Sequence, residues 1–187
     1  IGLEIYSSLK YSHHVKVYGA SGKNDHAAFV YPADYYIEDE NLYVGRTDFI
    51  DRLNVYLLEY AISFIYPTHD TVANFLAEHQ GELVAQVITS CSETNYIARF
   101  KRETYKHFTG YDFCPVVYSS PSDVLSFPVF LKPNDGQGGK GTFCANNQQT
   151  LDFYLHRSPD LLITEFLPGD EFSVDCFTDF SGMLLFI

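Results

Sequence analysis

The chain has 187 residues, of which 46% are hydrophobic and 17% aromatic, and its 24 acidic and 12 basic residues give a formal charge of −12. This composition is typical of globular proteins and excludes a largely disordered chain. An acidic chain lacks the basic face that nucleic acids and anionic membranes require, so we expect neither as a partner. A charged small molecule held by a few local lysines is compatible with these numbers.

The cysteines, the histidines and the hydropathy of the sequence further limit the class of protein. The four cysteines lie far apart and form no C-x-x-C pair, so neither a zinc ribbon nor a thioredoxin-type motif is indicated. His13, His14, His69 and Asp70 have no partners at metal-ligand spacing, and we expect solvated histidines and a helix N-cap. Because no run of about 18 apolar residues and no basic segment before an apolar one occurs, we expect a soluble, cytoplasmic protein.

The first half of the chain alternates three times between helical and strand-like patterns. Helical spacing is found in residues 1–11, 49–61 and 69–79, and short apolar runs follow in residues 14–21, 62–68 and 83–88. Such alternation is typical of a parallel sheet covered by helices, as in a Rossmann-like unit. A Rossmann-like unit normally opens on a strand, whereas this sequence opens on a helix, so we expect a first strand upstream of Ile1.

The pattern changes after about Ser92. One or two helices are expected in residues 92–108, and strands then dominate, interrupted by one helix at about residues 148–157. The expected strands are residues 114–119, 127–133, 141–145, 160–166, 171–180 and 182–187. We therefore predict an α/β protein, with a Rossmann-like domain in residues 1–95 and an α+β lobe in residues 96–187.

The segment FPVFLKPNDGQGGKGTFCA, residues 127–145, contains a G-x-G-x-x-G pattern at residues 136–141. A Walker A loop requires Ser or Thr after Gly-Lys, but Gly141 follows Lys140. A Rossmann loop runs from a strand into a helix, whereas the residues after this loop are strand-like. Protein kinases place their lysine on the strand after the loop, but Lys132 lies before it. The segment predicts a hairpin in which a lysine-bearing strand precedes a glycine loop.

This order of motifs resembles the ATP-grasp superfamily, and within it the large chain of carbamoyl-phosphate synthase and the smaller proteins built like it. The lysine strand and glycine loop of that family are similar to FPVFLKPNDGQGGKG. Its first lysine-bearing helix is similar to KRETYKHF, residues 101–108, and its strand, adenine-contacting linker and acidic residue are similar to LLITEFLPGDEFSVD, residues 161–175. The resemblance implies a pre-ATP-grasp domain over residues 1–95 and the first lobe of an ATP-grasp domain after it, with both ends of this arrangement missing.

The resemblance also implies a role for each motif. Lys101 and Lys132 would contact the nucleotide, Lys132 at the α and β phosphates. Glycines permit positive φ and close backbone approach, so the N–H groups of the loop could close on the β and γ phosphates. Backbone groups of Glu165 and Leu167 would bind the adenine, and the Glu171 carboxylate would accept from the ribose hydroxyls. The predicted nucleotide-binding residues are Lys101, Lys132, Gly136, Gly138, Gly139, Lys140, Gly141, Glu165, Phe166, Leu167 and Glu171.

The family uses ATP with Mg²⁺ or Mn²⁺ to activate a carboxylate as an acyl phosphate, which an amine or ammonia then attacks. The resemblance places the metal ligands beyond Ile187 and leaves the catalytic residues and the carboxylate substrate unassigned. We expect a fragment of a longer protein, while a truncated, inactive gene product and a subunit completed by another chain stay open. The alternative functions are a non-catalytic ATP-binding or regulatory module and an NAD-linked Rossmann protein. Association into a homo-oligomer is also left open.

Overall fold

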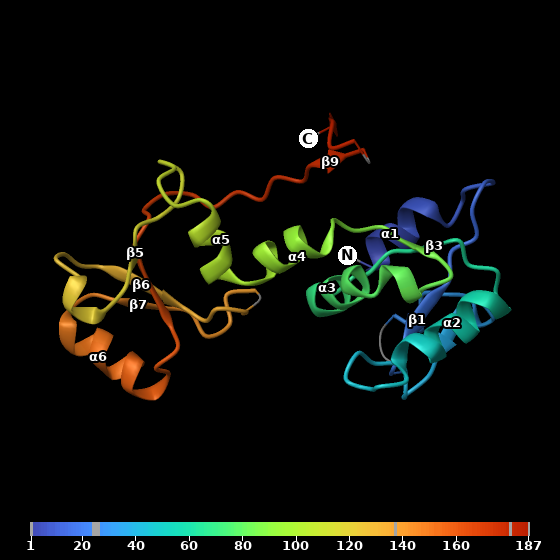
Figure 1. Ribbon diagram of the computed structural model, residues 1–187, viewed down its shortest axis with the longest axis horizontal. Coiled ribbons are helices and arrows are strands. Elements are labelled where there is room, and N and C mark those ends of the chain that lie inside the picture. Colours follow the sequence, from blue (N-terminus) through green and yellow to red (C-terminus); the bar gives the residue numbers. More distant parts are fainter. Residues whose placement is uncertain (1, 24–26, 137, 180, 187) are drawn as a thin grey trace. The chain divides into compact units, whose positions relative to one another are not determined.

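The computed structural model describes residues 2–23, 27–136, 138–179 and 181–186. The chain divides into two compact units, residues 1–107 and 108–187, whose elements are labelled in Figure 1. Residues 96–107 group with the first unit, whereas the sequence places its domain boundary after residue 95. That boundary between domains stays a prediction.

The first unit alternates helices with very short strands. Its helices are α1 (Gly2–Leu9), α2 (Phe49–Glu59), α3 (Asp70–Glu78), α4 (Ser92–Arg99) and α5 (Lys101–His107), with 3-10 turns at Ala33–Tyr35 and Gln80–Glu82. Its strands are β1 (Gly19–Ser21), β2 (Tyr36–Glu38), β3 (Phe64–Ile65) and β4 (Gln86–Val87). The five helices confirm the helical segments that hydrophobic spacing predicts in residues 1–108.

Both strand pairs of the first unit are parallel. Gly19 pairs with Tyr36 in the sheet of β1 and β2, and Phe64 pairs with Gln86 in the sheet of β3 and β4. The expected parallel pairing is therefore present, and α3 lies between β3 and β4 in the sequence as in a crossover connection. The described strands form two separate two-stranded sheets, however, and not the one covered sheet of a Rossmann-like domain. Residues 14–18 do not join β1 as expected, and Val15 among them is exposed.

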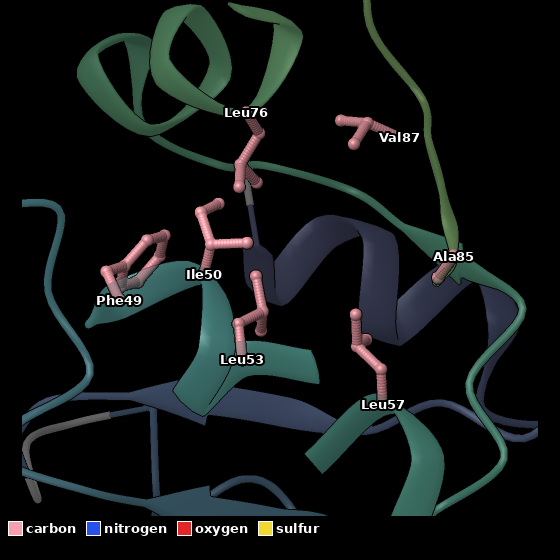
Figure 2. Packing of buried hydrophobic residues seen from close by; sticks show 7 residues of the cluster. All are labelled: Phe49, Ile50, Leu53, Leu57, Leu76, Ala85 and Val87. Atoms are coloured by element: carbon pink, nitrogen blue, oxygen red, sulfur yellow. The ribbon is translucent and has the colours of Figure 1, made fainter. Parts of the chain in front are cut away.

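The core of the first unit forms around α2. This helix buries Phe49, Ile50, Leu53 and Leu57, which recur at helical spacing and so occupy one face. Figure 2 shows Leu76 of α3 pointing toward that face, with Ala85 and Val87 of the β4 region completing the cluster. Full burial of each such side chain contributes about 1.5–3 kcal/mol. At the start of α3, His69 Nδ1 accepts from the Thr71 N–H at 3.2 Å, so the N-cap residue is His69, which was expected to be merely solvated, and Asp70 is the first residue of the helix.

The second unit is built on a four-stranded antiparallel sheet with strand order β5-β8-β6-β7. The strands are β5 (Val117–Tyr118), β6 (Val129–Lys132), β7 (Phe143–Ala145) and β8 (Leu162–Glu165), and a 3-10 turn occupies Pro121–Asp123. Helix α6 (Gln148–Arg157) connects β7 to β8 and lies along one face of the sheet (Figure 1). A separate antiparallel pair, β9 (Phe177–Thr178) and β10 (Leu184–Phe186), follows β8. The helix predicted at residues 148–157 is confirmed.

Strand β6 has two different faces. Val129 and Leu131 are fully buried and belong to the core that α6 covers through Leu151. Phe130 and Lys132 alternate with them, lie on the opposite face and are half-buried. The sheet therefore holds Lys132 on the face opposite α6.

The strand predicted at residues 171–180 is mostly wrong. Only Phe177 and Thr178 of β9 are extended and paired, and residues 171–176 have no regular secondary structure. The apolar residues that alternate there, Phe172 and Val174, are 82% and 66% exposed. Alternating apolar and polar residues form a strand only where a partner strand can pair with them and an apolar layer can cover their apolar side chains. The described residues provide neither beside residues 171–176. None of the helices in the described ranges is both long and apolar enough to cross a membrane.

Candidate nucleotide-binding site

The candidate site is built on the hairpin of β6 and β7. Val129 pairs with Ala145 and Leu131 with Phe143 in antiparallel register, so the chain reverses between Lys132 and Phe143. This geometry confirms the predicted order of strand, glycine loop and strand. It also excludes a Rossmann-type loop at this place, because a strand and not a helix follows the glycines.

Lys132 is the last residue of β6 and stands at the base of the loop. Its Nζ lies 5.7 Å from the centre of the Phe130 ring, which is two residues earlier on the same face of the strand. In the neighbouring strand β8, Leu162 is its register partner and is buried. The half-buried ammonium group of Lys132 therefore supplies a positive charge at the base of the glycine loop.

The glycines of the loop are required for two different reasons. Gly138, Gly139 and Gly141 have φ values of 57°, 70° and 72°, a region that residues with a Cβ rarely occupy. Gly136 lies outside that region, but a Cβ on it would come within 2.5 Å of the Pro133 ring. The loop is thus folded against its own base, and the predicted glycines are structurally necessary. Lys140, also predicted for the site, is exposed between them.

The predicted adenine linker begins at the end of β8. The Glu165 N–H donates to the Val116 carbonyl at 2.9 Å, which attaches this end of β8 to the segment before β5. Glu165 is half-buried, whereas Phe166 and Leu167 are exposed and lie outside regular secondary structure. Lys132 and Glu165 therefore lie on neighbouring strands of one sheet, but Glu165 is paired with Val129 at the other end of β6 from Lys132 and the glycine loop.

Two predicted residues lie elsewhere. The sequence predicts a strand at Glu171. In the structure, Glu171 instead lies in the exposed irregular segment before β9. Lys101 is the first residue of α5 and belongs to the first compact unit, where it is half-buried. The contact of either residue with a nucleotide stays a prediction.

A hollow in the first unit was not predicted. It measures about 430 Å³ and is lined by the loop of residues 44–47, by Ile50 and Asp51 of α2, and by Phe75 and His79 at the end of α3. The His79 ring stacks on Phe75 with 4.1 Å between ring centres. The hollow is lined by both polar and apolar residues, and none of the predicted nucleotide-binding residues lines it.

An ion-pair network lies next to this hollow and fixes the loop that forms its wall. Asp39, which is buried, accepts from Arg52 Nε at 2.6 Å, from the Tyr56 hydroxyl at 2.9 Å and from the Asn41 N–H at 2.9 Å. Burial raises the pKa of Asp39, but these hydrogen bonds outweigh the desolvation and leave the pKa lowered. A hydrogen bond from Arg46 likewise lowers the pKa of the Asp48 carboxyl. No local motif signals this network, because its partners are 13 and 17 residues apart in the sequence.

The described residues contain no group of three histidine, cysteine or acidic side chains that could hold a metal ion. Asp179 accepts hydrogen bonds from Ser181 and from the Met183 N–H, which lower its pKa and account for it as a turn residue. Magnesium ligands are therefore not assigned to any residue of this chain.

A comparison with known families finds a similarity in the second half of the chain. Residues 98–187 match the family model described as ATP-grasp domain. The matched segment contains the glycine hairpin and the predicted adenine linker after β8. The family match therefore covers these motifs, on which the resemblance in sequence is based. A comparison with curated proteins gave no match.

Solved structures are similar to this chain at low sequence identity. The L-amino acid ligase from Bacillus licheniformis is 16% identical with a TM-score of 0.56, and the similarity covers 72% of this chain and 34% of that protein. The biotin carboxylase domain of the 2-oxoglutarate carboxylase from Hydrogenobacter thermophilus, solved as a dimer with MgADP, ADP and bicarbonate, is 18% identical with a TM-score of 0.49, over 71% of this chain and 34% of that one. The chain therefore spans about one third of the length of these proteins. The likeness to the L-amino acid ligase shows a common fold.

Proposed function

We propose that residues 108–187 supply the phosphate-covering hairpin and the adenine linker of an ATP site in an ATP-dependent ligase of the ATP-grasp type. One observation carries the proposal: Lys132 ends a strand directly before a loop with three glycines at positive φ, and an antiparallel strand returns from it. The match of residues 98–187 to the ATP-grasp domain supports the same conclusion.

The residues present fit a nucleoside triphosphate. The ammonium group of Lys132 provides a positive charge for the α and β phosphates, and loop glycines let backbone N–H groups approach the terminal phosphates closely. Lys140 adds a second cation on the loop. The backbone of Glu165, Phe166 and Leu167 would hold the adenine by hydrogen bonds, as a linker at a strand end can do without any particular side chain.

Lys101 and Glu171 complete the proposed set, at the phosphates and at the ribose hydroxyls. When bound, ATP would provide the phosphoryl group that converts a carboxylate substrate into an acyl phosphate, and an amine or ammonia would then displace the phosphate. Magnesium or manganese would accompany the nucleotide, and we assign none of its ligands in this chain.

The finer assignment, to ligases like carbamoyl-phosphate synthase, is also a proposal. It rests on the order of the lysine helix, the lysine strand, the glycine loop and the linker along residues 101–175. A Rossmann-like first domain, a cytoplasmic location and self-association belong to the same proposal.

Titration calorimetry tests the nucleotide site. The full-length gene product should bind ATP in the presence of Mg²⁺, and Lys132→Ala should weaken binding about ten-fold or more, because a charge-assisted contact of about 1.5–3 kcal/mol is lost. Lys16→Ala is the matched control, since Lys16 is an exposed lysine of the first unit. Equal affinity of the Lys132→Ala and Lys16→Ala proteins would contradict the proposal. Tight ATP binding without release of ADP in the presence of candidate carboxylates and amines would favour a non-catalytic module.

A further inference from the structure

Thr142, the residue after the last loop glycine, closes the glycine loop. Its N–H donates to the Gly139 carbonyl at 3.3 Å, and its hydroxyl donates to the same oxygen at 2.7 Å. Residues 139–142 thus form a four-residue turn whose third residue, Gly141, has a φ of 72°. Glycine with positive φ at this position is the requirement of a type II turn. Sequence reasoning overlooked Thr142, although the spelling Gly-Lys-Gly-Thr fits such a turn.

The turn determines which way the loop amides point. A trans peptide places its C=O and N–H on opposite sides, so a Gly139 carbonyl held toward Thr142 directs the Lys140 N–H away from it. The next peptide is oriented too, because the Lys140 carbonyl lies 3.3 Å from the position of a Cβ on Gly136. With that carbonyl directed into the loop, the Gly141 N–H points out of it. The Gly139 carbonyl is thus held toward Thr142 and the Lys140 carbonyl lies next to Gly136, so the N–H groups of Lys140 and Gly141 point away from these two residues.

We infer that Thr142 is a positioning residue that pre-organises the N–H groups of Lys140 and Gly141 for the terminal phosphates of ATP. The inference rests on the proposed ATP site and deepens it. Without the hydroxyl, the Gly139 carbonyl retains one weaker hydrogen bond and can rotate toward the ligand, where its oxygen would repel a phosphate. Holding the donors in place before binding reduces the ordering cost of binding. Thr142 itself acts through the loop backbone and needs no contact with the nucleotide.

Two substitutions separate the hydroxyl from the size of the side chain. Thr142→Val removes the hydroxyl and keeps the shape, whereas Thr142→Ser keeps the hydroxyl. The matched control is Thr71→Val, because Thr71 is an exposed threonine on α3 of the first unit. Calorimetry on the full-length gene product with Mg²⁺ would compare ATP with AMP, which lacks the phosphates that the loop is proposed to cover.

The expected result is an ATP affinity about two- to ten-fold lower for Thr142→Val, the usual effect of one lost hydrogen bond. AMP affinity and the melting temperature should not change, and Thr142→Ser should restore ATP binding. Equal losses for ATP and AMP would indicate a merely structural role and overturn the inference. Wild-type affinity of Thr142→Val for ATP would also overturn it and leave the proposed site intact. Absence of ATP binding by the wild-type protein would instead refute the proposed site, and the inference with it.

Discussion

Leu131 is the side chain whose removal should most directly loosen the strand that carries Lys132. It is fully buried, pairs with Phe143 and Ile163 on the neighbouring strands, and belongs to the core beneath α6. Leu131→Ala loses the transfer free energy of the removed carbon atoms and leaves a cavity, which together cost about 3 kcal/mol at a well-packed site. Because about 1 kcal/mol corresponds to about 4–8 °C for a unit of this size, the melting temperature of the second unit should fall by about 12–24 °C.

The chain offers a matched control for this substitution. Leu125 belongs to the same unit and is 94% exposed, so Leu125→Ala should change the stability by less than about 0.5 kcal/mol. Urea unfolding of both variants gives the free energies, and an unchanged m-value would show that the unfolded state is not altered. Hydrogen exchange of peptides from residues 108–187 would assign the loss to the second unit.

The result for Leu131 also bears on the site. If Leu131→Ala destabilised the chain by less than about 1 kcal/mol, β6 would not be packed as the structure shows, and the position of Lys132 on the face opposite α6 would have no support. The stability could instead fall by about 3 kcal/mol while the ATP affinity, measured well below the melting temperature of the variant, is unchanged. That result would show that the hairpin binds ATP even when the core beneath it is less well packed.

Two further predictions concern a helix cap and a buried carboxylate. Asn147 accepts from the Thr150 N–H at 2.9 Å at the start of α6, so Asn147→Ala should cost about 1 kcal/mol in urea unfolding, whereas Asn146→Ala should cost clearly less. Asp39→Asn should lower stability by about 2 kcal/mol at neutral pH, because Arg52 would lose a charged acceptor. Since the pKa of Asp39 is lowered from 3.8, its contribution is complete above that pH and is lost as the pH falls below it. Wild type should therefore lose its advantage over Asp39→Asn in unfolding measured from pH 6 down to pH 2, and an advantage that persisted at low pH would refute this account.

The positions of the helices and of the glycine hairpin could be predicted because each depends on local information. The apolar spacing along α2 specifies a helix within one or two turns of chain. Lys132 before the glycines, and strand-like residues after them, likewise distinguished a hairpin from a Rossmann loop. Nothing beyond about 20 consecutive residues was needed for these predictions.

Tertiary structure decided the features that depend on distant partners. Residues 171–176 have the alternation of a strand, but a strand also requires a neighbour to bond its backbone, and Phe172 and Val174 are exposed instead. The buried carboxylate of Asp39 depends on Arg52 and Tyr56, which only the folding of α2 brings to it. The sequence by itself determined where the helices and the glycine hairpin form and where the lysine and glycines of the candidate site lie along the chain. Only the three-dimensional structure decided which strands pair and which carbonyls of the loop turn inward, because pairing and peptide orientation depend on contacts that sequence spacing does not encode.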